Sequence, residues 1–280
     1  MRTLRLMTQN QWNITENRPN WLEMGLDCSA ECRMKGHIQV FKELMPDIVG
    51  GQEVNKEMQI FLKTYCLQEG LPYSILWGNF TPIIYRADKF ELLHTEYIIY
   101  PKCIDGYAGE FNDVQSKSCN LGVFRAKDNG SVFVFATTHL WWMRDSDQKG
   151  SDLARKLQMQ QAIALIDKYC AMYGMCPAIL VGDMNAPLDS PALQFALTEG
   201  GFAHGHDVAT DYRHEGVGYN DCGLGGSGPG KWRNEPFELA IDHILVKGTP
   251  ENAVKRFDRY CPDYYLKLSD HAPVYIDIDL

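Results

Sequence analysis

Short apolar segments, each followed at once by polar residues, alternate along this chain with segments that have the periodicity of amphipathic helices. Residues 48–51 and 179–182 are examples of the apolar kind, and they have the length and composition of buried strands. Residues 34–45 carry a helical apolar stripe that Pro46 ends. Strands and helices alternate at both ends of the chain around a β-rich middle, so the pattern predicts a mixed α/β fold with packed sheets.

The individual elements follow from the same pattern. Strands are expected at residues 4–7, 48–51, 73–77, 82–86, 121–125, 132–137, 179–182, 240–246 and 274–278. Asn55, Ser151 and Ser190 are the expected N-caps of three helices, and Pro191 follows the last of them at a position that suits a first helical turn. No linker, repeat or low-complexity tract marks a boundary, so we expect residues 1–280 to form one domain.

The composition is that of a globular protein, with 45% hydrophobic and 22% charged residues. The net charge of −9 comes without any basic run, which argues against an extended surface for long nucleic acid, although a bound metal ion can reverse the local field. No apolar run is long enough for a membrane span, and the N-terminus has no apolar signal-peptide core. The nine cysteines are odd in number, so we expect free thiols and a cytoplasmic location.

Six strand ends carry side chains suited to catalysis. They are Asn10, Glu53, His139, Asp183 with Asn185, Asp242, and Asp270 with His271. A single carboxylate at a strand end usually caps a turn or faces solvent, but six such ends together are not explained by capping alone. They supply oxygen ligands for a divalent cation, groups that activate water and donors that stabilise a charged transition state, which is what phosphoester hydrolysis needs.

The order of these residues resembles the exonuclease–endonuclease–phosphatase superfamily, whose fold is DNase I-like. The matching pieces run in the order Asn10, Gln52-Glu53, Tyr85-Arg86, Thr138-His139-Leu140, Gly182-Asp183-Met184-Asn185, Ile241-Asp242-His243 and Ser269-Asp270-His271. Each piece is short, and the specificity comes from their order and from the GDxN and SDH pieces. The resemblance implies a four-layer α/β/β/α sandwich with two central mixed sheets and the site at their shared rim.

The resemblance also implies a metal site. Glu53 would be the principal ligand, with Asn10 and Asp270 nearby. Ligands that offer oxygen favour Mg²⁺ or Mn²⁺ over Zn²⁺, so Mg²⁺ or Mn²⁺ is the expected cofactor. Gly182 is expected to remove a side chain where the backbone approaches the substrate closely.

The remaining roles implied by the resemblance are catalytic and substrate-binding. Asp183 would orient or deprotonate the attacking water, and Asn185 would hydrogen-bond the phosphoryl oxygen or the water. His139 would stabilise the phosphoryl group or help the leaving oxygen. His271 would contact the phosphate as acid or base, and Asp242 would fix its tautomer. Tyr85 stands where the family often keeps a substrate-contacting residue.

Several residues near these motifs have two interpretations each. Adjacent residues on a strand point to opposite faces, so one of Trp141 and Trp142 is expected in the cleft, as a stacking platform for a base or sugar, and the other in the core. Lys117 is either a ligand of the substrate phosphate or an exposed strand lysine. Trp12 suggests an altered pocket wall. Residues 13–30 are either a lid over the cleft or an ordinary loop.

Two further patterns are set aside as sites. Residues 225–231 match most of a phosphate-binding P-loop, but Trp232 replaces the required Ser or Thr and no strand precedes the segment, so a flexible surface loop is expected. His204, His206 and Asp207 resemble half of a binuclear metal motif, but the second Asp-His pair that such a motif needs is missing.

Three functions remain open on the sequence. The preferred one is a metal-dependent phosphodiesterase or nuclease, the second a phosphomonoesterase on a small sugar or inositol phosphate, and the third a binding protein of the same fold without catalysis. The third is disfavoured because every expected catalytic position holds a competent residue. The expected partner is a phosphoester substrate, with nucleotides and nucleic acids among the candidates, and no obligate protein partner is evident.

Overall fold

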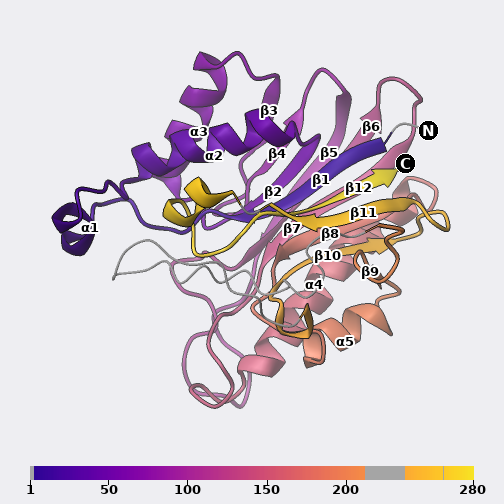
Figure 1. Cartoon of the computed structure of the whole chain (residues 1–280). Helices are drawn as coiled ribbons and strands as arrows, with labels where there is room; N and C mark the ends of the chain where they lie inside the picture. Colours follow the sequence, from indigo (N-terminus) through magenta and orange to yellow (C-terminus); the bar gives the residue numbers. More distant parts are fainter. Residues whose placement is uncertain (1–2, 212–236, 261) are drawn as a thin grey trace.

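Two six-stranded sheets face each other, and helices cover their outer faces (Figure 1). The structure, a computed structural model, describes residues 3–211, 237–260 and 262–280. The layers therefore run helix, sheet, sheet, helix, which confirms the expected four-layer α/β/β/α sandwich with two mixed sheets.

The first sheet has the strand order β11-β12-β1-β2-β4-β3. Its members are β11 (Val254–Arg259), β12 (Val274–Asp279), β1 (Thr3–Asn10), β2 (Ile48–Gln52), β4 (Ile83–Arg86) and β3 (Tyr73–Leu76). Only β1 and β2 pair in parallel in this sheet. The polar residues that follow β1 and β2 consequently emerge at the same rim, and the segment before β12 reaches that rim from the opposite direction.

The second sheet has the strand order β5-β6-β7-β8-β10-β9. Its members are β5 (Phe90–Ile99), β6 (Ser118–Ala126), β7 (Val132–His139), β8 (Ala178–Asp183), β10 (Asp242–Lys247) and β9 (Ala203–His204). Here β7 and β8 are parallel and the other pairs antiparallel. The register sets Asp183 opposite both His139 and Asp242, so three site residues lie in one row across three strands.

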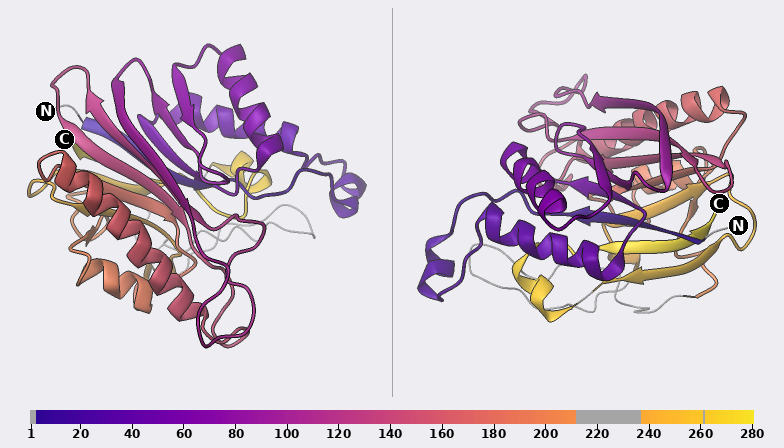
Figure 2. Two further views of the ribbon diagram at one scale, coloured as in Figure 1. Left: turned by 180° about the vertical axis from the view of Figure 1, so that it is seen from behind. Right: turned by 90° about the horizontal axis from the view of Figure 1, so that it is seen from above.

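The helices divide between the two outer faces. The first sheet is covered by α2 (Ala30–Leu44) and α3 (Lys56–Gln68). The second sheet is covered by α4 (Ser151–Met172) and α5 (Pro191–Leu197), and the left view of Figure 2 shows these two helices from behind. Three short helical turns complete the elements, α1 (Pro19–Glu23), η1 (Phe237–Leu239) and η2 (Asp263–Lys267). Among the described residues, no helix has both the length and the apolar character needed to cross a bilayer.

Apolar burial between the sheets holds the two halves together. The inner faces contribute buried side chains that include Leu6, Ile48, Phe135, Val181 and Ile276. Separate cores lie under α2 with α3 and under α4 with α5. Strand side chains alternate between the two faces of a sheet. A strand with a continuous apolar run therefore presents apolar side chains to both faces and is buried on both.

Two of the three expected N-cap residues are confirmed. Asn55 Oδ1 accepts from the backbone N–H of Met58, and Ser190 Oγ accepts from that of Leu193. The expectation for Ser151 is wrong, because Gly150 occupies the N-cap position with φ of 94° and Ser151 is the first helical residue. Glycine takes this left-handed backbone without a steric penalty. The Ser151 hydroxyl donates to Gln148 O and does not cap the helix.

Gly182 is required by the sheet rather than by a substrate. A Cβ at this position would lie 2.0 Å from the backbone oxygen of Thr138 on the neighbouring strand β7. The expectation that Gly182 clears space for substrate is therefore wrong, since the close approach is between β8 and β7.

Candidate active site

The candidate site lies at the rim where strands of both sheets end. Asn10 ends β1, Glu53 follows β2, His139 ends β7 and Asp183 ends β8. Asp242 begins the antiparallel strand β10, and Asp270 and His271 lie in the segment before β12. Rigid paired strands thus hold most of these side chains, and this suits catalytic groups that must keep their positions.

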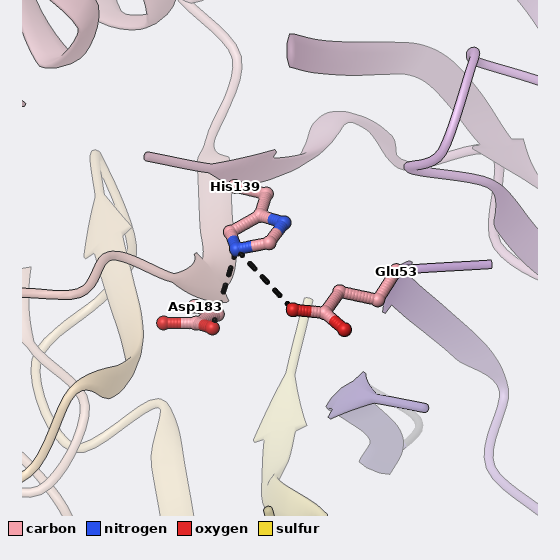
Figure 3. Close-up of side chains that lie close together, drawn as sticks. All are labelled: Glu53, His139 and Asp183. Carbon is pink, nitrogen blue, oxygen red and sulfur yellow. Dashed lines mark ion pairs between the residues drawn. The ribbon is translucent and has the colours of Figure 1, made fainter. Parts of the chain in front are cut away.

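Three groups lie close enough together to bind one cation. His139 Nε2 is 3.4 Å from Asp183 Oδ2 and 3.9 Å from Glu53 Oε1, as Figure 3 shows. One ligand atom from each of the three lies within 4.8 Å of the other two. A second such group joins Asp183 to Asp242 and His271. Carboxylate oxygens with an imidazole are a suitable donor set for a divalent cation, so the residues present fit a metal site.

The expected metal ligands are placed differently from one another. Glu53 and Asp270 both line the same cleft. The side-chain oxygen of Asn10 instead accepts from the backbone N–H of Trp12, at 2.9 Å. The amide oxygen of Asn10 is thus engaged by the backbone, and its amide nitrogen donates to Asp183.

Asp183 is the most enclosed carboxylate of the cleft, with 2% exposure. Asn10 Nδ2 donates to its Oδ2 at 2.9 Å, and the backbone N–H of Asn185 donates to its Oδ1 at 3.0 Å. Burial raises the pKa of Asp183 to about 7; the charge of the nearby His271 opposes this increase, and the charge of Asp242 adds to it. A carboxylate in this environment is suited to take a proton near neutral pH.

His271 is held by the carboxylate of Asp242 at the start of β10. Its Nδ1 lies 2.7 Å from Asp242 Oδ2, and its Nε2 lies 3.8 Å from Asp183 Oδ2. Burial disfavours the imidazolium, but the charges of Asp242, Asp183 and Asp270 outweigh it and hold the pKa of His271 well above its ordinary value. The ring is thus oriented through one nitrogen and presents the other to the cleft as a cation.

His139 and Lys117 form a contrasting pair. Burial, together with the charges of Lys117 and His271, lowers the pKa of His139 well below its ordinary value. Lys117 Nζ lies 2.7 Å from His139 Nε2, and burial lowers the pKa of this lysine. Lys117 is buried and lines the cleft, so it is not the exposed strand lysine that was one of its two interpretations.

The cleft has a volume of about 320 Å³ and an indole at its wall. Trp142 is 53% exposed, and its Nε1–H donates to Asp113 Oδ2 at 3.2 Å. Trp141 is 4% exposed and packs against Phe111. The two tryptophans therefore divide between cleft and core, as their alternation predicts.

Tyr85 and Trp12 lie away from the cleft. Tyr85 points into the core between the sheets, 5.0 Å from Phe124 between ring centroids, so its expected substrate contact is wrong. The pleat sends Ile83 and Tyr85 to the inner face together. Trp12 is buried against Trp21 in a small cluster of its own and is not a pocket wall.

The segment 13–30 does not cover the cleft. Its helix α1 extends away from the body of the molecule (Figure 1), and Trp21 is buried against Trp12. Of this segment, Asn13 alone lines the cleft, where its backbone N–H donates to Glu53 Oε2 at 2.8 Å. The structure thus favours the ordinary loop over the lid.

The two patterns that were set aside have different outcomes. Residues 225–231 lie outside the described residues. His204 is buried with its Nε2 3.0 Å from His243 Nδ1, and it packs in the core near β10 rather than in the cleft.

The family follows from comparison with known proteins. Residues 30–271 match the profile of the Endonuclease/Exonuclease/phosphatase family. The chain belongs to this family. Endonucleases, exonucleases and phosphatases all hydrolyse phosphoesters, so membership indicates phosphoester hydrolase activity. No curated protein matches the chain.

Solved structures of low identity share the fold of this family member over nearly the whole chain. An endonuclease/exonuclease/phosphatase from Bacteroides vulgatus is 22% identical, with a TM-score of 0.73 and coverage of 100% of both chains. A mannosyl-6-phosphatase from Bacteroides thetaiotaomicron is 20% identical, with a TM-score of 0.68, and the match covers 99% of this chain and 100% of that one. D. rerio TDP2, complexed with a single-strand DNA product, is 16% identical, with a TM-score of 0.65 and coverage of 100% of both chains. At these identities the likeness shows the fold alone.

The phosphoester hydrolase cleft also contains residues that the sequence did not reveal. Asn13, Asp113 and Val114 line it from loops, together with Ser116. Val114 has φ of 40°, which is unusual for a β-branched residue. Loops carry no periodicity, so no signal in a single sequence marks which of their residues reach a site.

Proposed function

We propose that this chain is a metal-dependent phosphodiesterase in which Asp183 activates water against a bound phosphodiester. The observation that carries the proposal is the convergence of Asp183, His139 and Glu53, from both sheets, on one open cleft. The exposed face of Trp142 at the wall of that cleft supports a substrate with a flat group beside its phosphate.

The proposed cofactor is Mg²⁺ or Mn²⁺. Glu53 and Asp270 would hold the ion from the cleft wall, with Asn10 as a further ligand, and His139 Nε2 lies 3.9 Å from Glu53 Oε1. When bound, it would act as a Lewis acid that neutralises charge on the phosphoryl group.

The protein's own groups would divide the remaining work. Asp183 would accept the proton of the attacking water, because its position is fixed by Asn10 and Asn185 and its burial favours the protonated product. His271, oriented by Asp242, would place a cationic N–H against a phosphoryl oxygen.

The other cleft residues would bind the phosphate. Lys117 would contribute positive charge from the buried side of the cleft, beside His139. Asn185 donates one N–H to Leu140 O at 3.0 Å, and its amide has a second N–H for the phosphoryl group or the water.

We also propose that the protein works in the cytoplasm. The seven cysteines of the described residues are unpaired, which supports a reducing compartment.

A substrate panel with Mg²⁺ tests the proposal. We would compare kcat/KM for two diester classes and for monoesters. The diesters are bis(p-nitrophenyl) phosphate and the nucleic acids RNA, single-stranded DNA and double-stranded DNA, and the monoesters are p-nitrophenyl phosphate and hexose and inositol phosphates. We expect diesters to be turned over faster than monoesters. A marked preference for a sugar or inositol monophosphate would replace the diesterase by a phosphomonoesterase, and no turnover of any phosphoester would indicate a binding protein.

A further inference from the structure

A second cavity adjoins the cleft. It has a volume of about 640 Å³, within the range of small-molecule sites, and it shares Trp142 and Asn185 with the cleft. The rest of its lining includes Arg144, Leu239 and Ile241. A group attached to a phosphate bound at Asn185 would therefore reach this cavity beside the indole of Trp142.

The cavity offers exposed apolar surface to a ring. Trp142 is 53% exposed and Leu239 is 49% exposed. The bond from Trp142 Nε1 to Asp113 holds the indole by its edge, at 3.2 Å, which leaves a face for stacking. Stacking of a base on an aromatic side chain is tolerant of sequence and contributes about 1–3 kcal/mol per base.

The charge available in the cavity is positive, although acidic residues also line it. Asp145 accepts from Lys149 Nζ and from the backbone N–H of Gly150, each at 2.9 Å. Asp152 pairs with Arg155. Arg144 is exposed, and its guanidinium makes no hydrogen bond or ion pair within the described ranges 3–211, 237–260 and 262–280. An anion entering the cavity would thus meet a cation that is not already engaged.

We propose that this cavity binds the nucleotide next to the scissile phosphodiester, with its base against Trp142 and its own phosphate paired with Arg144. The inference rests on the proposed phosphodiesterase function and makes it more specific. The substrate class is then a nucleic acid strand or short oligonucleotide with a second phosphate, rather than a diester with a single charge. A guanidinium suits this role because it binds phosphate through two parallel hydrogen bonds.

Matched dinucleotides test the assignment. One has a single phosphodiester and no terminal phosphate, and the others carry an added 5′- or 3′-phosphate. We expect wild-type kcat/KM to be about tenfold or more higher for one phosphorylated form, which is the effect of one charge-assisted contact. Arg144→Gln should remove this preference by lowering kcat/KM for the phosphorylated dinucleotide to that for the unphosphorylated one.

Two controls keep the outcomes distinct. Arg18→Gln replaces an exposed arginine outside both cavities and should keep the wild-type preference. Trp142→Ala should raise KM for every dinucleotide, because it removes the stacking surface rather than the phosphate contact. Equal hydrolysis of all dinucleotides by wild type, or an unchanged preference in Arg144→Gln, would overturn the second-phosphate site alone. Hydrolysis of p-nitrophenyl phosphate with none of any dinucleotide would overturn the diesterase function itself.

Discussion

Asn10 and Asp183 join the two sheets at the floor of the cleft, where Asn10 Nδ2 donates to Asp183 Oδ2 at 2.9 Å. Asn10 ends β1 in one sheet and Asp183 ends β8 in the other. The relative placement of the sheets therefore fixes the orientation of the carboxylate that we propose as the base. This carboxylate needs no movement of a loop to reach its position.

Asp183→Asn is expected to lower kcat by about 100- to 10,000-fold, the usual contribution of a general base. The fold should survive, because burial already favours the uncharged form of this side chain and raises its pKa to about 7. Steady-state kinetics on the best diester of the panel, together with a thermal melt, would measure both effects.

The matched control for this change is Asp189→Asn. Asp189 is exposed six residues further along the chain and does not line the cleft. Wild-type turnover is expected in this control. If Asp183→Asn kept wild-type turnover as well, Asp183 would not be the base.

Metal dependence is expected to follow Glu53. EDTA should abolish activity, and Mg²⁺ or Mn²⁺ should restore it, because carboxylate oxygens are the ligands these ions prefer. Binding to the folded state should also raise the melting temperature of the wild type as the ion concentration increases.

Glu53→Gln should lose most of this metal-dependent rise in melting temperature, since it removes a charged ligand. Glu57→Gln is the control, because Glu57 is exposed in the first turn of α3 and does not line the cleft. Full activity after thorough chelation, or an equal metal response in both variants, would rule out the proposed ion site.

The sequence could predict much of the site because its residues follow apolar strands. The apolar runs before Glu53, His139 and Asp183 identify the strands, and the polar residue identifies the rim. Motif order predicts Tyr85 at the substrate, whereas strand alternation sends Ile83 and Tyr85 to the same inner face, where the structure has them. The bond from Asn10 to Asp183 could not be predicted, since it depends on the packing of two separate sheets.

The strands that the sequence did not predict are edge strands. The expected set lacked β5, β9 and β11, and each of these pairs on one side only. An edge strand pairs on one side only and tolerates charged residues, and these interrupt the apolar pattern of Phe90–Ile99 and Val254–Arg259. Such segments resemble loops until their pairing partner is known.

The free energy of unfolding is expected to decrease as the pH falls, because of His37. This side chain is buried, and burial followed by the charge of Arg33 lowers its pKa well below the ordinary value. Gln9 Nε2 lies 3.0 Å from its Nδ1, and the ring of Tyr265 lies 5.8 Å away. The folded state therefore holds His37 neutral at pH values where the unfolded chain already binds a proton.

The sign follows from this difference in proton binding. The stabilisation that depends on neutral His37 is present above the pKa of about 6.5 that His37 has in the unfolded chain. It is lost as the pH falls below that value, by up to about 1.4 kcal/mol per pH unit for one proton. Denaturant unfolding between pH 7 and pH 5 would show the slope. His37→Gln should make it shallower, while His139, His204 and His243, whose pKa values burial also lowers, should keep part of it. An identical slope in wild type and variant would contradict this role.

Arg33 is expected to be the most important buried cation for stability. All five of its N–H groups are engaged with backbone oxygens, which belong to Gln11, Trp12, Ile14, Cys28 and Leu268. The guanidinium thereby ties the segment after Asn10 to the segment that leads into Asp270. Lysine has three donors at a single point and cannot reproduce this planar arrangement.

Arg33→Lys should lower the free energy of unfolding by about 3 kcal/mol or more, because several buried carbonyl groups lose their donors at about 1–3 kcal/mol each. Arg18→Lys, an exposed change of the same kind, should stay within about 0.5 kcal/mol of wild type. Urea unfolding would measure both. Since Arg33 holds the backbone on both sides of the site, Arg33→Lys should also weaken the Mg²⁺-dependent rise in melting temperature. A variant as stable as wild type, with an unchanged response to Mg²⁺, would show that these segments keep their places without the guanidinium.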